Sequence, residues 1–227
     1  MRNLKKIGAT IFALCCFTVV LAQNNPKFEK EVFVGLSMNN FTGDIENTKI
    51  KMGFHAGFTA RYYFIENIFL ESSLGVATKG YKSDITNSSG KYWDDEGENY
   101  DIEGSAKYTS YNIDLPILVG YKFNLNDELN IKFKAGPYLT YALSGKLKEE
   151  GSITIYPDIH SSETEHYSDE LKIGDIDGFK NFGYGLHAGI SADYKQFILS
   201  ASYQHAFSEI VDGAKEQNIL VSLGYRF

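Results

Sequence analysis

Apolar residues alternate with small or polar residues along most of this chain, and this pattern limits the folds that it can adopt. The last segment is an example, because Ile219, Val221 and Leu223 alternate with the polar residues Asn218 and Ser222. Successive side chains of a strand point to opposite faces, so each alternating segment is predicted to be a strand with one apolar face. Eight strands are expected, over residues 32–40, 52–64, 68–81, 108–123, 129–145, 179–194, 197–210 and 217–227.

The connections between these strands are of two kinds. Short turns follow Phe64, Phe123 and Tyr194, whereas long polar stretches cover residues 82–107 and 146–178. In an up-and-down order, the short turns fall at one end and the long loops at the other. Short turns at one end and longer outer loops at the other are typical of transmembrane barrels.

The two alternating rows distinguish a membrane barrel from a soluble eight-stranded barrel such as a lipocalin. One row is large and charge-free, whereas the other combines glycines with charged residues and histidines. The charged and histidine members of the second row are His55, Arg61, Glu71, Lys79, Asp114, Lys122, Lys132, Lys134, His187, Asp193 and Arg226. The interior of an eight-stranded barrel is just wide enough for such side chains, so the apolar row would face lipid. The predicted fold is therefore all-β, an eight-stranded antiparallel up-and-down transmembrane β-barrel.

The inward charges are expected to form an ion-pair and polar cluster that closes the lumen near the end with the short turns. If the turn at residues 65–67 joins a regular hairpin, Phe64 opposes Ile68 and Arg61 lies directly across from Glu71. The expected members of the cluster are Arg61, Glu71, Asp114, Lys122, Lys132, Lys134, Asp193 and Arg226.

Aromatic residues gather next to the short turns and at the end of the chain. They are Tyr62, Phe64, Tyr121, Phe123, Tyr194, Phe197, Tyr225 and Phe227. This clustering is typical of an aromatic girdle at a membrane interface. A closing strand that ends in a C-terminal Phe also resembles the last strand of bacterial outer-membrane β-barrels. The resemblance implies that Tyr225 and Phe227 form an assembly signal, with the barrel-assembly machinery as a partner.

The first 22 residues have the features of a signal peptide. Three basic residues (Arg2, Lys5 and Lys6) precede an apolar run, and cleavage is expected before Gln23. An uncleaved membrane anchor is the alternative, but the run is short for a spanning helix. Beyond this segment, the chain has no run of 18 apolar residues and no helical periodicity. The predicted domains are therefore a signal peptide at 1–22 and an outer-membrane barrel at 23–227, located in the bacterial outer membrane.

The exported part of the chain would contain no cysteine, because Cys15 and Cys16 both lie within the predicted signal peptide. Neither a disulfide nor a cysteine-based metal site is expected there. The whole chain has a net charge of −7, and loss of the three basic residues of the signal peptide would make it more acidic. This acidic balance argues against a nucleic-acid partner.

Two segments resemble a known family more specifically. The segment Tyr111-Asn-Ile-Asp-Leu-Pro-Ile-Leu-Val-Gly-Tyr-Lys-Phe123 resembles the central strand of PorT-like outer-membrane barrels of the Bacteroidetes type. Ala135-Gly-Pro-Tyr-Leu139 is similar to the next strand of that family. Many members are described only as porin-like, and one branch works in protein secretion. The resemblance therefore implies a barrel and leaves its role open.

No enzymatic activity, cofactor or metal site is expected. Inward histidines and serines are present, but no nucleophile-elbow or other triad pattern accompanies them. The acidic residues of the two polar stretches lack the ordered spacing of an EF-hand and are expected to be solvated; a Ca²⁺ site or a platform for cationic or sugar ligands is the alternative. We expect a barrel with a filled lumen that acts through its outer loops or binds an envelope partner. The alternatives are a narrow conduit for small solutes and an accessory barrel of a secretion system.

Overall fold

The computed structural model describes residues 27–43, 48–86, 92–93, 99–158, 161–211 and 213–227. The predicted signal peptide, with both cysteines, lies outside these residues. Within them, no helix is long and apolar enough to cross a membrane. The helical structure described is a short 3-10 turn, η1 (Ile173–Asp175).

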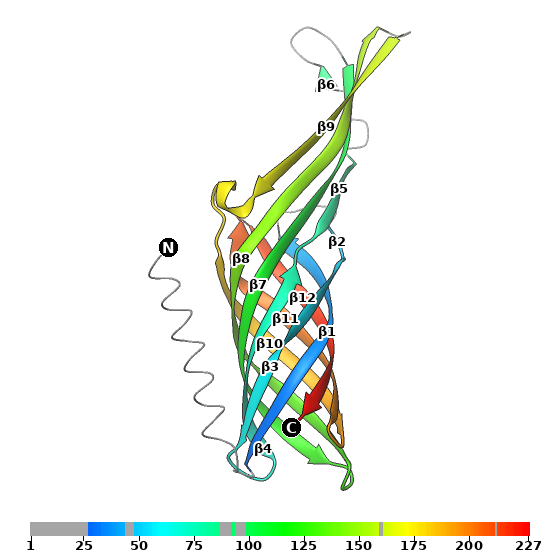
Figure 1. Ribbon diagram of the computed structural model, residues 1–227. Helices are drawn as coiled ribbons and strands as arrows, with labels where there is room; N and C mark the ends of the chain where they lie inside the picture. Colours follow the sequence, from blue (N-terminus) through cyan, green and yellow to red (C-terminus); the bar gives the residue numbers. More distant parts are fainter. Residues whose placement is uncertain (1–26, 44–47, 87–91, 94–98, 159–160, 212) are drawn as a thin grey trace.

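Eight strands form a closed ring (Figure 1). They are β1 (Phe28–Gly43), β3 (Lys51–Tyr63), β4 (Ile68–Lys79), β7 (Asn99–Asn124), β8 (Leu129–Asp158), β10 (Phe182–Tyr194), β11 (Phe197–Val211) and β12 (Ala214–Arg226). Each pairs antiparallel with its neighbours in chain order, and β1 pairs with β12 from Glu31↔Arg226 to Gly43↔Ala214. The eight predicted strands and their up-and-down order are therefore confirmed.

The three short turns lie at one end of the barrel, with the C-terminus (Figure 1). The turn between β10 and β11 has two residues, and Lys195 adopts a positive φ of 55° there. The side chain of Asn126 accepts hydrogen bonds from the backbone N–H groups of Glu128 (3.0 Å) and Leu129 (2.8 Å) in the turn before β8. Asn favours turns because its side chain can bond to nearby backbone in this way.

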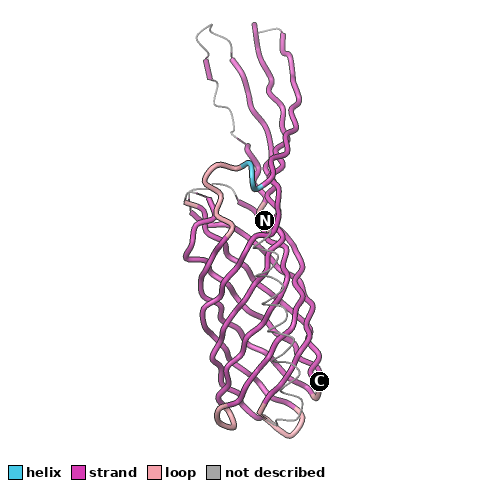
Figure 2. The backbone as a smooth tube through the Cα atoms, turned by 60° about the vertical axis from the view of Figure 1, so that its left-hand side comes forward, coloured by secondary structure: helices cyan, strands magenta, loops and turns pink. Residues whose placement is uncertain are grey.

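The prediction of two long polar loops was wrong. Residues 82–107 and 146–178 include β5 (Lys82–Thr86), β6 (Tyr92–Trp93), β9 (Ser161–Lys172) and long extensions of β7 and β8. The β7–β8 pairing continues to Asn99↔Tyr156, while β5 pairs with β7 and β9 with β8. These strands rise above the barrel as a sheet, which we call the outer sheet (Figure 2). Strands without a lipid-facing side need no long charge-free row, so the alternation that marks the barrel strands is weak here.

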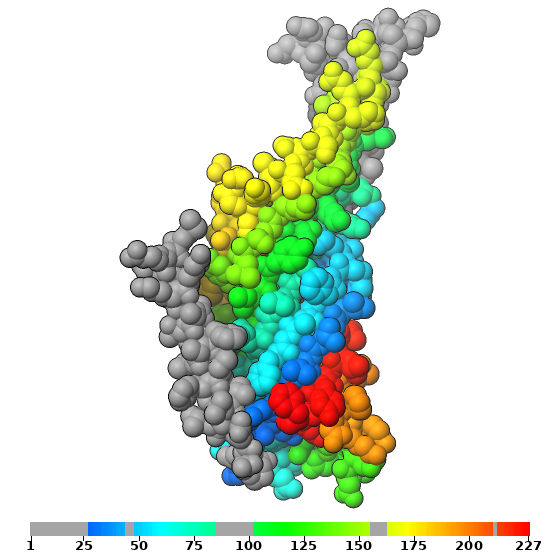
Figure 3. Space-filling model, viewed as in Figure 1, coloured from blue at the N-terminus to red at the C-terminus, as the bar shows by residue number. Residues whose placement is uncertain are grey.

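The barrel has polar residues inside and apolar residues outside. Leu36 is 60% exposed and Leu223 55% exposed on the outer wall, whereas Lys132 and Asp193 are fully buried inside. All eight girdle aromatics are exposed, and Figure 3 shows the red C-terminal residues on the surface near the lower end. A soluble barrel would have the opposite arrangement, so the lipocalin alternative is excluded.

The height of the apolar wall also fits a membrane. Tyr121 of the lower girdle and Tyr111, ten residues before it in β7, are exposed on the outer wall and mark the lower and upper limits of the apolar band on this strand. Ten residues of strand cover about 33 Å, which at a tilt of about 40° corresponds to roughly 25 Å in height. An apolar band of about 25 Å is the usual height for barrels of this membrane.

One inward glycine makes room for an aromatic ring inside the barrel. A Cβ atom on Gly120 would lie 2.2 Å from Cζ of Phe69, whose side chain is fully buried. We expect Gly120→Ala to destabilise the barrel by about 1–3 kcal/mol, because the ring cannot move without displacing its neighbours. Urea unfolding of the refolded barrel in detergent micelles measures the loss. The control is Gly75→Ala, where the closest atoms lie at 3.1 and 3.4 Å; equal losses in both variants would contradict the prediction.

Candidate functional site

The lower lumen holds a network of four cationic and four carboxylate side chains, which we call the lower charge network. It is made by residues from β1, β3, β4, β8, β10 and β12. Its members are Glu29, Glu31, Arg61, Glu71, Lys132, Lys134, Asp193 and Arg226. The equal number of positive and negative groups lets the network be buried without a net charge, which reduces the cost of removing the charges from water.

Arg61 is the centre of this network and is only 1% exposed. Its guanidinium donates to Glu71 from Nε (2.8 Å) and Nη2 (2.5 Å), and to Glu29 at 2.8 Å and Glu31 at 3.1 Å. The strand register places it directly opposite Glu71. Its carbon Cζ also lies 5.3 Å from the centre of the Phe69 ring. One guanidinium therefore holds three carboxylates from two strands, which suits its planar set of donors.

The other cations complete the network around the same carboxylates. Lys132 Nζ lies 2.5 Å from Asp193 and 3.0 Å from Glu29. Lys134 Nζ lies 2.6 Å from the second oxygen of Glu71, while Arg226 is 3.3 Å from both Glu29 and Asp193. Every member shares at least one partner with another member, so the network crosses the lumen from wall to wall.

Two of the residues expected in the cluster lie elsewhere. Asp114 belongs to an upper pair of carboxylates, where Lys79 Nζ is 2.9 Å from Asp114 and 3.4 Å from Glu216. Lys79 also lies 5.3 Å from the centre of the buried Tyr138 ring. Lys122 lies over the ring of Tyr63, at 4.8 Å from its centre, and makes no ion pair with a described residue. The predicted single cluster is therefore two clusters at different heights.

Four charged members of the two clusters were not among the predicted members of the ion-pair and polar cluster. They are Glu29, Glu31, Lys79 and Glu216. Lys79 was predicted to face inward but was not assigned to the cluster. The other three lie in extensions of predicted strands. They are at positions that the two-residue alternation assigns to the inward face. If the first predicted strand were extended back to Phe28 and the last back to Ala214, the same two-residue spacing could have identified these three residues.

Large apolar side chains inside the barrel were also missed. Phe69, Leu118, Tyr138 and Ile198 are each at most 1% exposed and face the lumen. The sequence prediction had expected mainly glycines and long charged groups there. These bulky side chains fill part of the lumen.

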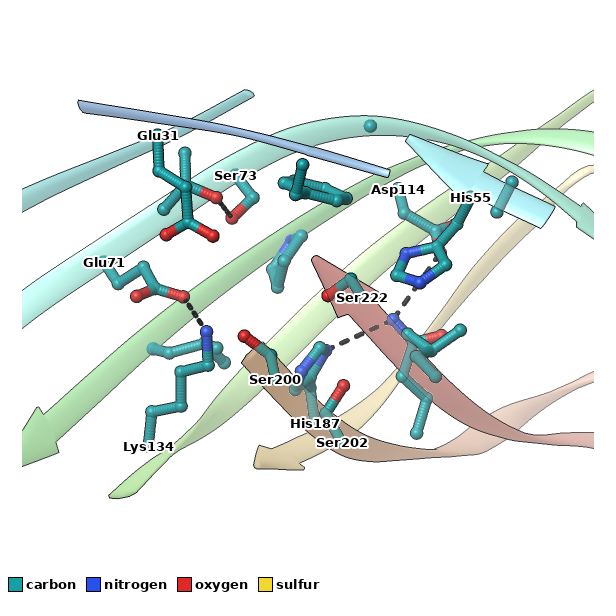
Figure 4. A pocket seen from close by; sticks show the side chains of 18 of the residues that line it. Glu31, His55, Glu71, Ser73, Asp114, Lys134, His187, Ser200, Ser202 and Ser222 are labelled. Carbon is teal, nitrogen blue, oxygen red and sulfur yellow. Dashed lines mark hydrogen bonds and ion pairs between the residues drawn. The ribbon is translucent and has the colours of Figure 1, made fainter. Parts of the chain in front are cut away.

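A cavity of about 60 Å³ remains in the middle of the lumen (Figure 4). Glu71 and Lys134 lie on one side of it, and His55 and Asp114 on the other. The side-chain nitrogen of Gln204 lies 3.2 Å from Nδ1 of His187 and 3.5 Å from Asp114. Neither histidine is hydrogen-bonded to a serine among the described residues. The cavity therefore lacks the nucleophile–base contact that acyl-transfer chemistry requires.

The outer end of the lumen is closed by an apolar cluster. Inward side chains from five barrel strands pack with Ile173 of η1. The buried members are Phe41, Tyr108, Ala142, Ile173, Ile210 and Ala214. Phe41 contacts the rings of Tyr81 and Tyr108 with centres 4.9 and 5.8 Å apart. The lumen is thus blocked by charged groups at the lower end and by aromatic and aliphatic groups at the upper end.

The acidic residues of the outer sheet do not form a recognisable metal site where the structure describes them. No group of three or more His, Cys, Asp or Glu side chains in the described part of the chain is arranged to hold a metal ion. Asp94, Asp95, Glu96 and Glu98, four of the acidic residues considered for Ca²⁺, lie outside the described residues.

The two residues assigned to the assembly signal lie on the outer wall at the lower end. Tyr225 is 47% and Phe227 63% exposed. Tyr225 contacts the ring of Phe197 with centres 5.7 Å apart, and the backbone N–H of Phe227 donates to the carbonyl of Lys30. Both aromatic side chains are therefore accessible from the membrane interface.

One comparison with known proteins, a match to a family model, agrees with this architecture. The model of the outer membrane protein beta-barrel domain family matches residues 21–212. The attachment invasion locus protein Ail of Yersinia pestis is 19% identical, with a TM-score of 0.41 over 88% of this chain and 99% of Ail. Neisserial surface protein A is 15% identical, with a TM-score of 0.37 over 87% of this chain and 95% of that protein. At TM-scores this low, these two likenesses do not support an argument about the fold. No curated protein matches the chain.

The family match covers most of the chain. The strands also have the features that we expected of a membrane barrel. The ring closes between the first and last strands, the charged groups face inward, and the apolar wall has the height of a membrane. The chain belongs to the outer membrane protein beta-barrel domain family and is a protein of the bacterial outer membrane.

Proposed function

We propose that this protein is a non-enzymatic, closed barrel that anchors the outer sheet and presents it to a protein partner outside the membrane. The observation that carries the proposal is the blocked lumen beneath a sheet that continues far beyond the membrane-spanning wall. A conduit needs a continuous path, whereas both ends of this lumen are filled by packed side chains.

The outer sheet has an edge suited to binding another strand. β9 is the last strand in the sheet order and pairs only with β8, so its other edge is unpaired within the described residues. An extended peptide can add to such an edge through backbone hydrogen bonds. The exposed acidic side chains on β9, which include Glu163, Glu165 and Asp169, favour a partner strand that carries basic residues.

An aromatic side chain also holds the strands of the outer sheet in register. The side chain of Tyr167 on β9 lies over Gly151, directly opposite it on β8, and over Gly104, one strand further on β7. A Cβ atom on Gly151 would be 2.5 Å from the tyrosine hydroxyl, and one on Gly104 would be 2.9 Å from it. An aromatic side chain that covers glycines in neighbouring strands pins their register. A strand edge that is already held in register loses less conformational entropy when a partner binds.

Several finer assignments accompany this proposal. Residues 1–22 would direct export, and Tyr225 and Phe227 would be read during assembly. The PorT-like type rests on the resemblance of residues 111–123 and 135–139. A role as an accessory barrel in protein secretion would be one case of partner binding through the outer sheet.

A trimmed barrel tests the proposal. Residues 84–105 and 149–169 are each replaced by Asn-Gly, so that the cross-strand pairs Ser83↔Ala106 and Lys148↔Glu170 flank two-residue turns. The trimmed protein is expected to insert and to shift on a gel when boiled, but to fail to restore a deletion strain screened for secretion, permeability and envelope integrity. Planar-bilayer recordings of the full-length barrel are expected to show no large, steady conductance.

Two results would contradict the proposal. Full restoration by the trimmed barrel would show that the outer sheet is not the working part. Large and steady conductance by the full-length barrel would instead support the conduit alternative. The gel shift controls for folding in both experiments.

A further inference from the structure

A row of lysines crosses the outer wall just above the apolar band. Lys49 on β2 (Thr48–Lys49) is directly opposite Lys82, Lys82 is opposite Lys107, and Lys107 is opposite Lys148. In the row of outward-facing positions just below, nearer the apolar band, Lys146 is opposite Lys172. We call these six residues the lysine band; they lie on β2, β5, β7, β8 and β9, which run side by side where the outer sheet leaves the barrel (Figure 1).

This arrangement is unfavourable for the protein alone. Like charges directly opposite each other on neighbouring strands destabilise a sheet, and three consecutive cross-strand pairs here are lysine with lysine. Neighbouring strands are about 4.8 Å apart, so the four backbone positions of the row span only about 14 Å. The chain as a whole has a net charge of −7, so this positive band is a local departure from its composition.

Acidic neighbours neutralise only part of the band. Lys49 pairs with Asp84, Lys148 with Glu150, and Lys146 with Glu170 at 2.8 Å. The hydrogen bond from Lys146 lowers the pKa of Glu170, so that ion pair persists when the pH falls moderately. Lys82, Lys107 and Lys172 are exposed and form no ion pair with any described side chain.

The lower row of the lysine band lies within the headgroup layer, and the upper row lies just above it. Lys107 is four residues above Tyr111 on β7, and Lys146 is opposite Thr109, two residues above it. These separations are about 13 and 7 Å along the strand, or roughly 10 and 5 Å in height at the tilt of such barrels. The polar interface of a bilayer begins at the end of the hydrocarbon and is about 5–8 Å thick. Lysine side chains that start above this polar interface can bend down and place their ammonium groups in it.

We propose that the lysine band is a binding site for the phosphorylated headgroup of an outer-leaflet lipid. The band supplies three unpaired ammonium groups, the apolar wall directly below would contact the acyl chains, and phosphate would relieve the repulsion between the lysines. The site is independent of the proposed partner-binding function, because the trimmed barrel keeps all six lysines.

Lipid retention in nanodiscs tests the site. The probe is lipid A carrying its phosphates, mixed into phosphatidylcholine nanodiscs, with lipid A stripped of its phosphates as the paired probe. The variant is Lys82→Gln, Lys107→Gln and Lys172→Gln combined. The control combines Lys180→Gln, Lys195→Gln and Lys215→Gln, which removes the same charge from other parts of the barrel.

The wild type and the control are expected to retain phosphorylated lipid A, as measured by native mass spectrometry. The band variant should bind it on the order of a hundredfold more weakly, since each lysine near an anionic membrane surface contributes about 1 kcal/mol. High salt should weaken the wild-type binding, because exposed charges are screened. A boiling-dependent gel shift confirms that all the proteins are folded.

Two outcomes would overturn the site. One is retention of phosphorylated lipid A by the band variant at the wild-type level. The other is equal retention of the stripped lipid by the wild type, which would assign the binding to the acyl chains. The trimmed barrel lacks Asp84 and Glu150, the partners of Lys49 and Lys148, so it should bind phosphorylated lipid A at least as tightly as the wild type. Such binding would support the site whatever the outcome for the outer sheet.

Discussion

Deletion of the closing strand, residues 217–227, should leave no barrel inserted in the membrane. β12 pairs with β1 on one side and with β11 on the other, so its loss exposes two strand edges at once. Unpaired backbone groups in hydrocarbon cost several kcal/mol each, and an open sheet cannot persist there. Fractionation followed by a carbonate wash measures the inserted protein. Recovery of the truncated chain in washed membranes would contradict this expectation.

Deletion of Phe227 alone separates assembly from stability. The residue contributes one exposed ring and a single backbone hydrogen bond to Lys30, so its loss removes little of the pairing. We expect less protein to be inserted, while the inserted fraction keeps nearly the same heat stability, measured by gel shift against temperature. Phe123→Ala, which removes another exposed girdle ring, serves as the control and should leave the yield nearly unchanged. A normal yield for the Phe227 deletion would show that this ring is only an interface anchor.

Removal of the central arginine should cause the largest loss of stability from a single substitution. Arg61→Met leaves Glu29, Glu31 and Glu71 close together around a buried position that has lost its cation. Breaking a buried ion pair on one side costs about 3–5 kcal/mol, because the remaining charge is left uncompensated. Urea unfolding of the barrel in micelles, followed by the gel shift, measures the change.

Two further variants test the physical reason for that loss. Arg226→Met removes the same charge from the rim, where the side chain is 26% exposed, and should cost at most about 1 kcal/mol. Adding Glu71→Gln to Arg61→Met leaves three cations and three carboxylates, and should restore part of the stability. If the double variant lost the sum of both single changes, charge balance would not be what holds the network together.

The sequence was sufficient for the membrane barrel because lipid makes the pattern of a barrel strand unambiguous. A strand that crosses the membrane must present an apolar residue at every second position, and residues such as Val221 and Leu223 show this directly. Arg61 opposite Glu71 also follows from the sequence, because a short turn sets the register of a hairpin. The lysine band, in contrast, joins residues as far apart in the chain as Lys49 and Lys148, and their spacing carries no signal of proximity.

Which residues face lipid and which face the lumen follows from the sequence alone, since this depends only on the two-residue period of a strand. The tertiary structure was needed to divide the inward charges, with Arg61 at the centre of one network and Asp114 in another beside Lys79. It also decided that the polar stretches continue as strands, because backbone pairing outside the membrane needs no apolar row. Height in the barrel and the neighbours across the lumen depend on the closure of the ring, and no local pattern encodes them.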